Sequence, residues 1–208
     1  MNPPSDFDAV ADRLRACRLC RDAPRYGRAL PHEPRPILQG SPSARLCIAS
    51  QAPGTRAHAS GIPFADRSGV RLRQWLGLDE ATFYDPSRVA IVPMGSCFPG
   101  QDDKGGDLPP RRECAETWRG PVFAGLPDLE LVLLIGQYAQ AWHLGEDFHD
   151  GLAATVKRWR AILSGPRRPR ILPLPHPSWR NNGWLTKNPW FEAELLPVLR
   201  AELRSILT

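Results

Sequence analysis

Two short polar segments of this chain carry residue types suited to chemistry, and each follows an apolar run. The first is Ser50-Gln-Ala-Pro-Gly54, and the second is His176-Pro-Ser178, which leads into the loop Trp179-Arg-Asn181. In α/β proteins, residues that handle ligands gather at the carboxyl ends of buried strands. A histidine there is held by rigid backbone, beside a loop that can contact a large partner. The two segments therefore predict one site, with His176 as its leading functional side chain.

The elements that must position this site follow from the apolar pattern. Short runs rich in Val, Ile and Leu predict four strands, at Arg45–Ser50, Arg88–Met94, Glu130–Ile135 and Arg170–Leu174. Fully apolar runs of this length fit a parallel sheet that is covered on both faces. Helical spacing predicts helices at Val70–Leu78, Arg111–Leu126, Tyr138–Leu144 and Pro189–Leu207, the last of them kinked at Pro197.

This alternation of strands and helices predicts an α/β fold, with three layers (α/β/α) around a central, mostly parallel four-stranded sheet. The 208 residues suit a single domain over residues 1–208. The Pro- and Gly-rich stretches Ala23–Pro42 and Pro99–Pro110 predict long loops with a functional or metal-organising role. No apolar run is long enough to cross a bilayer, and the N-terminus has no secretory pattern, so we expect a cytoplasmic protein.

The basic residues are almost all arginine. Of 27 Lys and Arg residues, 24 are Arg, and the net charge is +5. Arginine binds phosphates with its forked guanidinium and stacks on bases, which suits a nucleic-acid partner. A GC-rich genome, whose codons favour Arg, gives the same composition. The charge therefore permits a DNA partner without demonstrating one.

The cysteines give a second, independent pattern. Cys47 lies inside an apolar strand, where a free cysteine acts as a small hydrophobic residue. The other four follow the pattern C-x2-C-x76-C-x16-C, at Cys17, Cys20, Cys97 and Cys114. Disulfides are rare in a reducing compartment, so four thiols indicate an all-cysteine metal site that holds either zinc or an iron–sulfur cluster.

Several of these motifs together carry a resemblance to a known family. They are Gln51-Ala-Pro-Gly54, Gly61-Ile-Pro-Phe64 with Ser68-Gly69, the two later cysteines, Gly136 and His176-Pro-Ser178. Over roughly residues 15–202, the chain resembles the uracil-DNA glycosylase superfamily, and most closely bacterial members of its iron–sulfur branch. In that branch four cysteines of this order hold a structural [4Fe–4S] cluster, so the resemblance favours the cluster over zinc.

The resemblance also implies a role for each site residue. A glycosylase flips the damaged nucleotide into a pocket and breaks its N-glycosidic bond, and the leaving uracil gains charge on its O2 oxygen. His176 would donate a hydrogen bond to that oxygen, as in an oxyanion hole. Gln51 would position water. The rest of the expected site would contact the substrate: Ala52, Pro53 and Gly54 as pocket backbone, Phe64 as a stacking ring, Ser178 on a phosphate, and Trp179, Arg180 and Asn181 as the loop that enters the duplex.

The chain departs from the family pattern at three places. Relatives read the base edge with an Asn in the segment before Cys97, where this chain has Pro93-Met94. Relatives often carry an acidic residue where this chain has Gln51, which cannot accept a proton from water at neutral pH; Asp66 and Asp107 are the nearest candidates for that task. Trp179 replaces a smaller residue, and it either enters the duplex or caps a hydrophobic edge.

Taken together, the residues and the resemblance predict a monomeric, monofunctional DNA-repair glycosylase. It would remove uracil, or a related deaminated base, from DNA and leave an abasic site. Two alternatives stay open. The missing Asn and the neutral Gln51 also fit a protein of the same fold that binds damaged DNA without cutting it. An unrelated α/β enzyme that acts on nucleotides would have no affinity for DNA.

Overall fold

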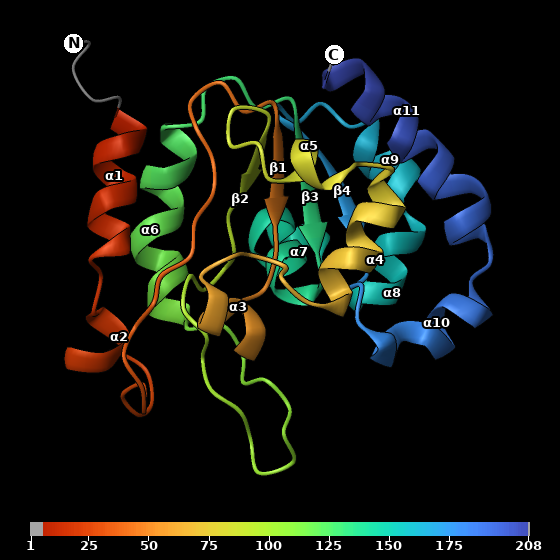
Figure 1. Ribbon diagram of the computed structural model, residues 1–208. Coiled ribbons are helices and arrows are strands. Elements are labelled where there is room, and N and C mark those ends of the chain that lie inside the picture. The colour runs from red at the N-terminus through yellow and green to blue at the C-terminus, as the bar shows by residue number, and fades with distance from the viewer. Residues whose placement is uncertain (1–5, 208) are drawn as a thin grey trace.

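A central parallel sheet organises the chain. The computed structural model describes residues 6–207. Its four strands are β1 (Leu46–Ala49), β2 (Val89–Ile91), β3 (Leu131–Ile135) and β4 (Arg170–Leu174), in the order β2-β1-β3-β4, and every pair is parallel. All four lie where the apolar runs predicted them, and helices surround the sheet (Figure 1). The predicted α/β class with a central four-stranded sheet is confirmed.

The strand β2 is shorter than the predicted run Arg88–Met94 because of a proline. Pro93 has no N–H group to donate to a neighbouring strand. The backbone nevertheless continues alongside β1, where Val92 N donates to Ile48 O at 3.0 Å and Met94 N donates to Ser50 O at 2.8 Å. The segment after β2 is therefore held beside the end of β1.

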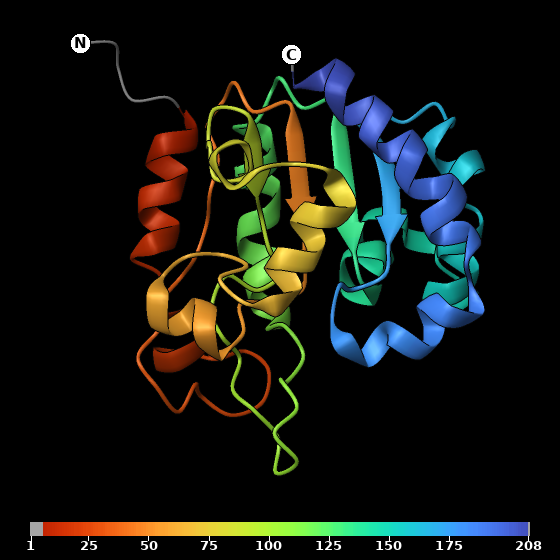
Figure 2. The ribbon, with the colours of Figure 1, turned by 45° about the vertical axis from the view of Figure 1, so that its right-hand side comes forward.

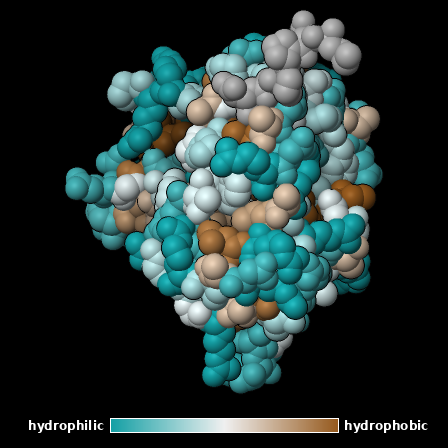
Figure 3. Space-filling model, turned by 90° about the vertical axis from the view of Figure 1, so that its left-hand side faces the viewer, coloured by the Kyte–Doolittle hydropathy of each residue, from teal (hydrophilic) through white to brown (hydrophobic). Residues whose placement is uncertain are grey.

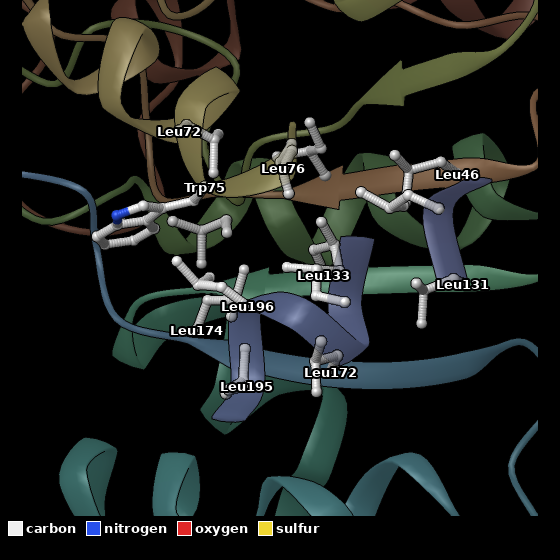
Figure 4. Close-up of a cluster of buried hydrophobic side chains, with 14 of the residues drawn as sticks. Leu46, Leu72, Trp75, Leu76, Leu131, Leu133, Leu172, Leu174, Leu195 and Leu196 are labelled. Atoms are coloured by element: carbon white, nitrogen blue, oxygen red, sulfur yellow. The ribbon is translucent and has the colours of Figure 1, made fainter. Parts of the chain in front are cut away.

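Side chains alternate between two cores, one on each face of the sheet. Leu46 and Ile48 of β1 face one core, whereas Cys47 and Ala49 face the other. Fully buried strands on both faces explain why these runs are continuously apolar. Figure 4 shows part of the first core, where Leu133 lies among leucines and a tryptophan that come from helices on that side of the sheet.

The helices divide between these faces. Helix α4 and the C-terminal helix cover the first face, and α1, α6 and α7 cover the second, which gives the three layers (Figure 2). The helices are α1 (Asp6–Arg15), α2 (Leu19–Asp22), α3 (Thr55–Ser60), α4 (Arg67–Leu76), α5 (Glu80–Phe83), α6 (Arg112–Ala124), α7 (Gln137–Leu144), α8 (Gly151–Lys157), α9 (Trp159–Leu163), α10 (Asn182–Lys187) and α11 (Leu196–Ile206), with 3-10 turns at Gly145–Asp147 and Trp179–Asn181.

The helix predicted over Pro189–Leu207 is present over residues 190–206, and the structure adds a π-helical turn within it. A π-helical turn, Phe191–Leu195, comes first, and the α-helix α11 begins after it at Leu196. Pro197 thus lies in the first turn of α11, directly after the π turn, where its missing N–H is tolerated. The wider π turn absorbs the change in backbone geometry.

The predicted loop Pro99–Pro110 extends beyond the carboxyl edge of the sheet, at the bottom of Figure 1. Asp102 closes its tip by accepting hydrogen bonds from the backbone of Lys104 and Gly106 at 2.9 and 2.7 Å. The base is closed by Leu108 N, which donates to Gly100 O at 2.9 Å. The lower end of the molecule is hydrophilic in the space-filling view (Figure 3). Within residues 6–207, no helix has the length and apolar character needed to cross a membrane.

Candidate functional site

The two predicted segments lie at the same carboxyl edge of the sheet, one on either side of the end of β3. Gln51 follows β1 and His176 follows β4, while Gly136 follows β3, which lies between these strands. The Gln51 side chain lies directly on Gly136, because a Cβ atom there would be 2.4 Å from Gln51 Nε2. The Gln51 carbonyl also accepts a hydrogen bond from Gly95 N at 2.9 Å. The ends of β1 and β3 and the segment after β2 therefore hold Gln51 in place.

The loop after β4 holds the backbone of His176. Asn181 Nδ2 donates a hydrogen bond to the His176 carbonyl at 2.7 Å. Arg71 of helix α4 donates to Ser178 O at 3.2 Å and to Asn182 Oδ1 at 2.8 Å, which ties the loop to the first helical layer. No sequence pattern pointed to this use of Arg71. Asn181 was predicted to contact DNA, which stays a prediction, and in the structure its amide also binds the chain's own backbone.

The imidazole of His176 is neutral at pH 7. Burial lowers its pKa from the usual value, and this effect outweighs the charges of Asp66 and Asp107, which act in the opposite direction. A neutral imidazole keeps one N–H that can donate a hydrogen bond, and which of its two nitrogens carries the hydrogen depends on the partner. His176 can therefore stabilise developing negative charge without first taking up a proton.

The residues after His176 form a short 3-10 turn, and one aromatic ring projects from it. Ser178 Oγ starts the turn by accepting a hydrogen bond from Arg180 N at 3.2 Å. The Trp179 side chain is 71% exposed, so it does not cap a hydrophobic edge. The Arg180 guanidinium lies 5.8 Å from the centre of the Trp179 ring. A cation and an aromatic ring thus stand together on the surface next to His176.

Phe64 is held by an unusual backbone conformation. Its φ of +55° is the only positive value at a non-glycine position in the described residues. The Phe64 carbonyl lies so close to Gly69 that a Cβ there would be 1.8 Å from it. The Tyr84 hydroxyl donates to Pro63 O at 3.0 Å, and the Phe64 ring packs edge-on against Phe83, with centroids 6.1 Å apart. Strained backbone of this kind collects at functional sites.

The segment before Cys97, where the family resemblance implied a base-reading Asn, contains buried apolar side chains. Met94 is buried in the second core. The buried Arg119 of helix α6 donates to the carbonyls of Val92 and Pro93 at 3.2 and 3.3 Å. Sequence reasoning missed Arg119, because an arginine in an amphipathic helix normally faces solvent. The backbone of this segment is therefore held on one side by Arg119 and on the other by its hydrogen bonds to the segment around the end of β1.

The four predicted ligand cysteines line one pocket. Cys17, Cys20, Cys97 and Cys114 surround it, together with Trp118 and neighbouring prolines, and the cavity between them has a volume of about 10 Å³. Two N–H groups point at sulfur: Trp118 Nε1 lies 3.3 Å from Cys17 Sγ, and Ser96 N lies 3.3 Å from Cys114 Sγ. All five cysteines are free thiols, and Cys47 lies apart in β1, as predicted.

The structure does not establish a metal site. Among residues 6–207, no three His, Cys, Asp or Glu side chains form a group that could hold a metal ion. Burial, followed by the neighbouring Cys114, raises the pKa of the Cys20 and Cys97 thiols to about 12. These thiols are therefore neutral in the absence of a cation, and the [4Fe–4S] cluster and its zinc alternative stay predictions.

A comparison with protein families decides the class of this site. The model of the Uracil DNA glycosylase superfamily matches residues 38–200, a range that contains Gln51, Phe64 and His176. The chain belongs to this superfamily. The match begins after Cys17 and Cys20, so it supports the uracil DNA glycosylase superfamily as a whole and not the iron–sulfur branch within it. It also removes the alternative of an unrelated α/β enzyme. The roles of the individual residues are proposals.

Proposed function

We propose that this protein is a monofunctional DNA glycosylase that hydrolyses the N-glycosidic bond of uracil, or of a related deaminated base, and leaves an abasic site. The observation that carries the proposal is a half-buried, neutral His176 after β4, at the same carboxyl edge of the sheet as Gln51 after β1 and within the matched family range. A fixed donor at this place suits a leaving base whose O2 oxygen becomes negative.

The other residues of the site take roles that fit their surroundings. The Phe64 ring stacks on the flipped base, since the strained turn holds it half-exposed. Pro53 and Gly54 form pocket backbone, and the Ser178 hydroxyl donates to a phosphate while its oxygen accepts the Arg180 N–H. The exposed pair Trp179 and Arg180 fills the space that the flipped base leaves in the duplex, where an aromatic ring can stack on the neighbouring bases.

Excision of uracil from DNA tests the proposal. Purified protein is incubated with a uracil-containing oligonucleotide and then with alkali, which breaks the strand only where a base has been removed. The wild type should give a break, and His176→Ala should slow excision by about 10²-fold, the loss expected for one oxyanion donor. Binding without any strand break would identify a damaged-DNA-binding protein instead, and unchanged turnover in the variant would refute the role of His176.

We further propose that Cys17, Cys20, Cys97 and Cys114 hold a [4Fe–4S] cluster. Each thiolate of such a cluster binds a different iron, so the four sulfurs stand further apart than around a single zinc ion. The pocket that all four cysteines line is the observation that supports this proposal. The cluster would tie the N-terminal segment to helix α6 beside the site, and its role would be structural.

The colour of the protein tests the cluster. Protein purified without oxygen should be brown, with broad visible absorption and about four iron atoms per chain. Cys17→Ser should lose most of this absorption. The matched control Cys47→Ala changes a cysteine outside the pocket and should keep it. A colourless protein that contains zinc would refute the cluster and leave the glycosylase proposal intact.

A further inference from the structure

The site as described lacks a group that can take a proton from the attacking water. The Gln51 amide can hold water by hydrogen bonds, but it cannot act as a base at neutral pH. Two carboxylates, Asp66 and Asp107, are close enough for their charges to act on His176. The structure gives these two aspartates different surroundings, and this difference separates their roles.

The Asp66 carboxylate caps the first turn of helix α4. It is the N-cap of α4, and its Oδ1 accepts a hydrogen bond from Gly69 N at 2.9 Å. This bond satisfies one of the free N–H groups of the first helical turn. The same cap maintains the turn that contains Phe64. Asp66 therefore has a structural task that accounts for its position.

Asp107 caps no helix, and its carboxylate faces Gly54, a residue of the proposed base pocket. A Cβ atom on Gly54 would lie 3.4 Å from Asp107 Oδ2. The other oxygen, Oδ1, accepts a hydrogen bond from Gln101 Nε2 at 3.2 Å. Gln101 and Asp107 also pair as an isolated antiparallel bridge at the base of the long loop. The loop thus returns to the end of β1 with one carboxylate oxygen held by Gln101 and the other turned toward Gly54.

We propose that the carboxylate of Asp107 is the catalytic base of this enzyme. This inference rests on the proposed glycosylase function. In the reaction, the bond between C1′ and the base nitrogen breaks, and its electron pair leaves with the base. The water oxygen forms the new bond to C1′, and Asp107 accepts the proton of that water. Solvent then exchanges this proton and protonates the base anion, so water is the only co-reactant.

The test compares three aspartate variants in single-turnover excision of uracil from DNA. Asp107→Asn removes the base and should lower the rate by about 10²-fold or more, the usual contribution of a general base. Asp103→Asn removes an equal charge from the same exposed loop and should stay within about twofold of the wild type. Asp66→Asn keeps an N-cap residue and should lose less than about tenfold.

A binding measurement separates chemistry from DNA affinity. Asp107→Asn should bind uracil-containing DNA at least as tightly as the wild type, because a negative charge near the phosphates has been removed. Since Asp107 is exposed, formate added to Asp107→Ala should restore part of the lost rate, whereas chloride at equal ionic strength should not.

Several outcomes would overturn the inference. An Asp107→Asn rate within about threefold of the wild type would do so, as would an Asp66→Asn rate that falls as far as that of Asp107→Asn. Parallel losses of rate and affinity in Asp107→Asn would show that the residue only shapes the loop. A wild-type protein that removes no base would refute the proposed function itself, which is a different result from an active enzyme that tolerates Asp107→Asn.

Discussion

Contacts between backbone and single side chains decide how the candidate site is built. Gln51 lies on a glycine, the Asn181 amide binds the His176 carbonyl, and Asp107 faces another glycine. In each case a side chain is placed by a neighbour that is small or that offers only backbone atoms. Such contacts leave little room for change, because protein interiors are close-packed.

Gly136 provides a test at this scale. Its φ is +83° and its missing side chain makes room for Gln51, whereas Gly145 at the other end of α7 has φ of +59° and open space around it. Gly136→Ala and Gly145→Ala should each cost about 1–2 kcal/mol of stability through backbone strain, measured by urea unfolding.

Only Gly136→Ala should lower excision, by about tenfold or more, because the new methyl group displaces Gln51. Equal excision by the two variants in a single-turnover assay would show that the place of Gln51 does not matter for the reaction.

At the scale of single elements, the turn between two helices positions part of the site. The turn over residues 61–69 links α3 to α4, and it combines the positive φ of Phe64, the Asp66 cap and the close approach of Gly69. Tyr84 closes the turn from α5 by donating to the carbonyls of Pro63 and Phe64. One short segment therefore sets both the start of a core helix and the position of an aromatic ring at the site.

Gly69 tests this element. Glycine inside a helix is normally replaced by alanine with a gain of up to about 1 kcal/mol in stability. Gly69→Ala should instead destabilise the protein by more than about 2 kcal/mol, because the methyl group would meet the Phe64 carbonyl at 1.8 Å.

Gly183→Ala in helix α10, where nothing lies within 4 Å of the added carbon, is the matched control and should be neutral or slightly stabilising. Denaturant unfolding of the two variants measures the difference. If both variants changed the free energy of unfolding in the same direction, the turn over residues 61–69 would have to relax around the added methyl group at little cost.

At the scale of the whole molecule, charged groups are buried between layers. Arg119 of α6 crosses the second core, where it binds the carbonyls after β2 and contacts His143 Nε2 of α7. Arg167, just before β4, donates to the His143 carbonyl at 3.4 Å. His143 thus links two helices and the approach to the edge strand, and it must stay neutral to accept from Arg119.

Acid should therefore destabilise the fold through His143. Burial, followed by Arg119 and Arg167, lowers its pKa to about 3 from the usual 6.5. Below pH 6.5, His143 is protonated in the unfolded chain, but in the folded protein it stays neutral until the pH reaches about 3. The stability of the fold therefore falls as pH falls through this window. At pH 5, this effect of His143 lowers the free energy of unfolding by at most about 2 kcal/mol.

His143→Gln keeps an acceptor for Arg119 but cannot be protonated. The drop in melting temperature between pH 7 and pH 5 should therefore be smaller in this variant than in the wild type. Burial also lowers the pKa of His58 and His176, so part of the drop should remain in both proteins. Identical drops would show that His143 does not control acid stability.

The amino-acid sequence by itself determined the four strands, their parallel sheet and the place of the motifs around Gln51 and His176. Buried parallel strands need continuous apolar runs, and the carboxyl end of each run is visible in the chain. Short helices such as α3 and α5 were not predicted. A helix of one or two turns is too short to show the helical repeat of apolar residues in the sequence.

Only the tertiary structure decided which distant residues meet. Asp107 faces Gly54, Gln51 lies on Gly136, and Arg119 is buried beneath Pro93. These contacts depend on the paths of the loops and on how the layers pack, and no local pattern encodes either. For the same reason, only the folded chain shows that Asp66 caps a helix while Asp107 faces Gly54.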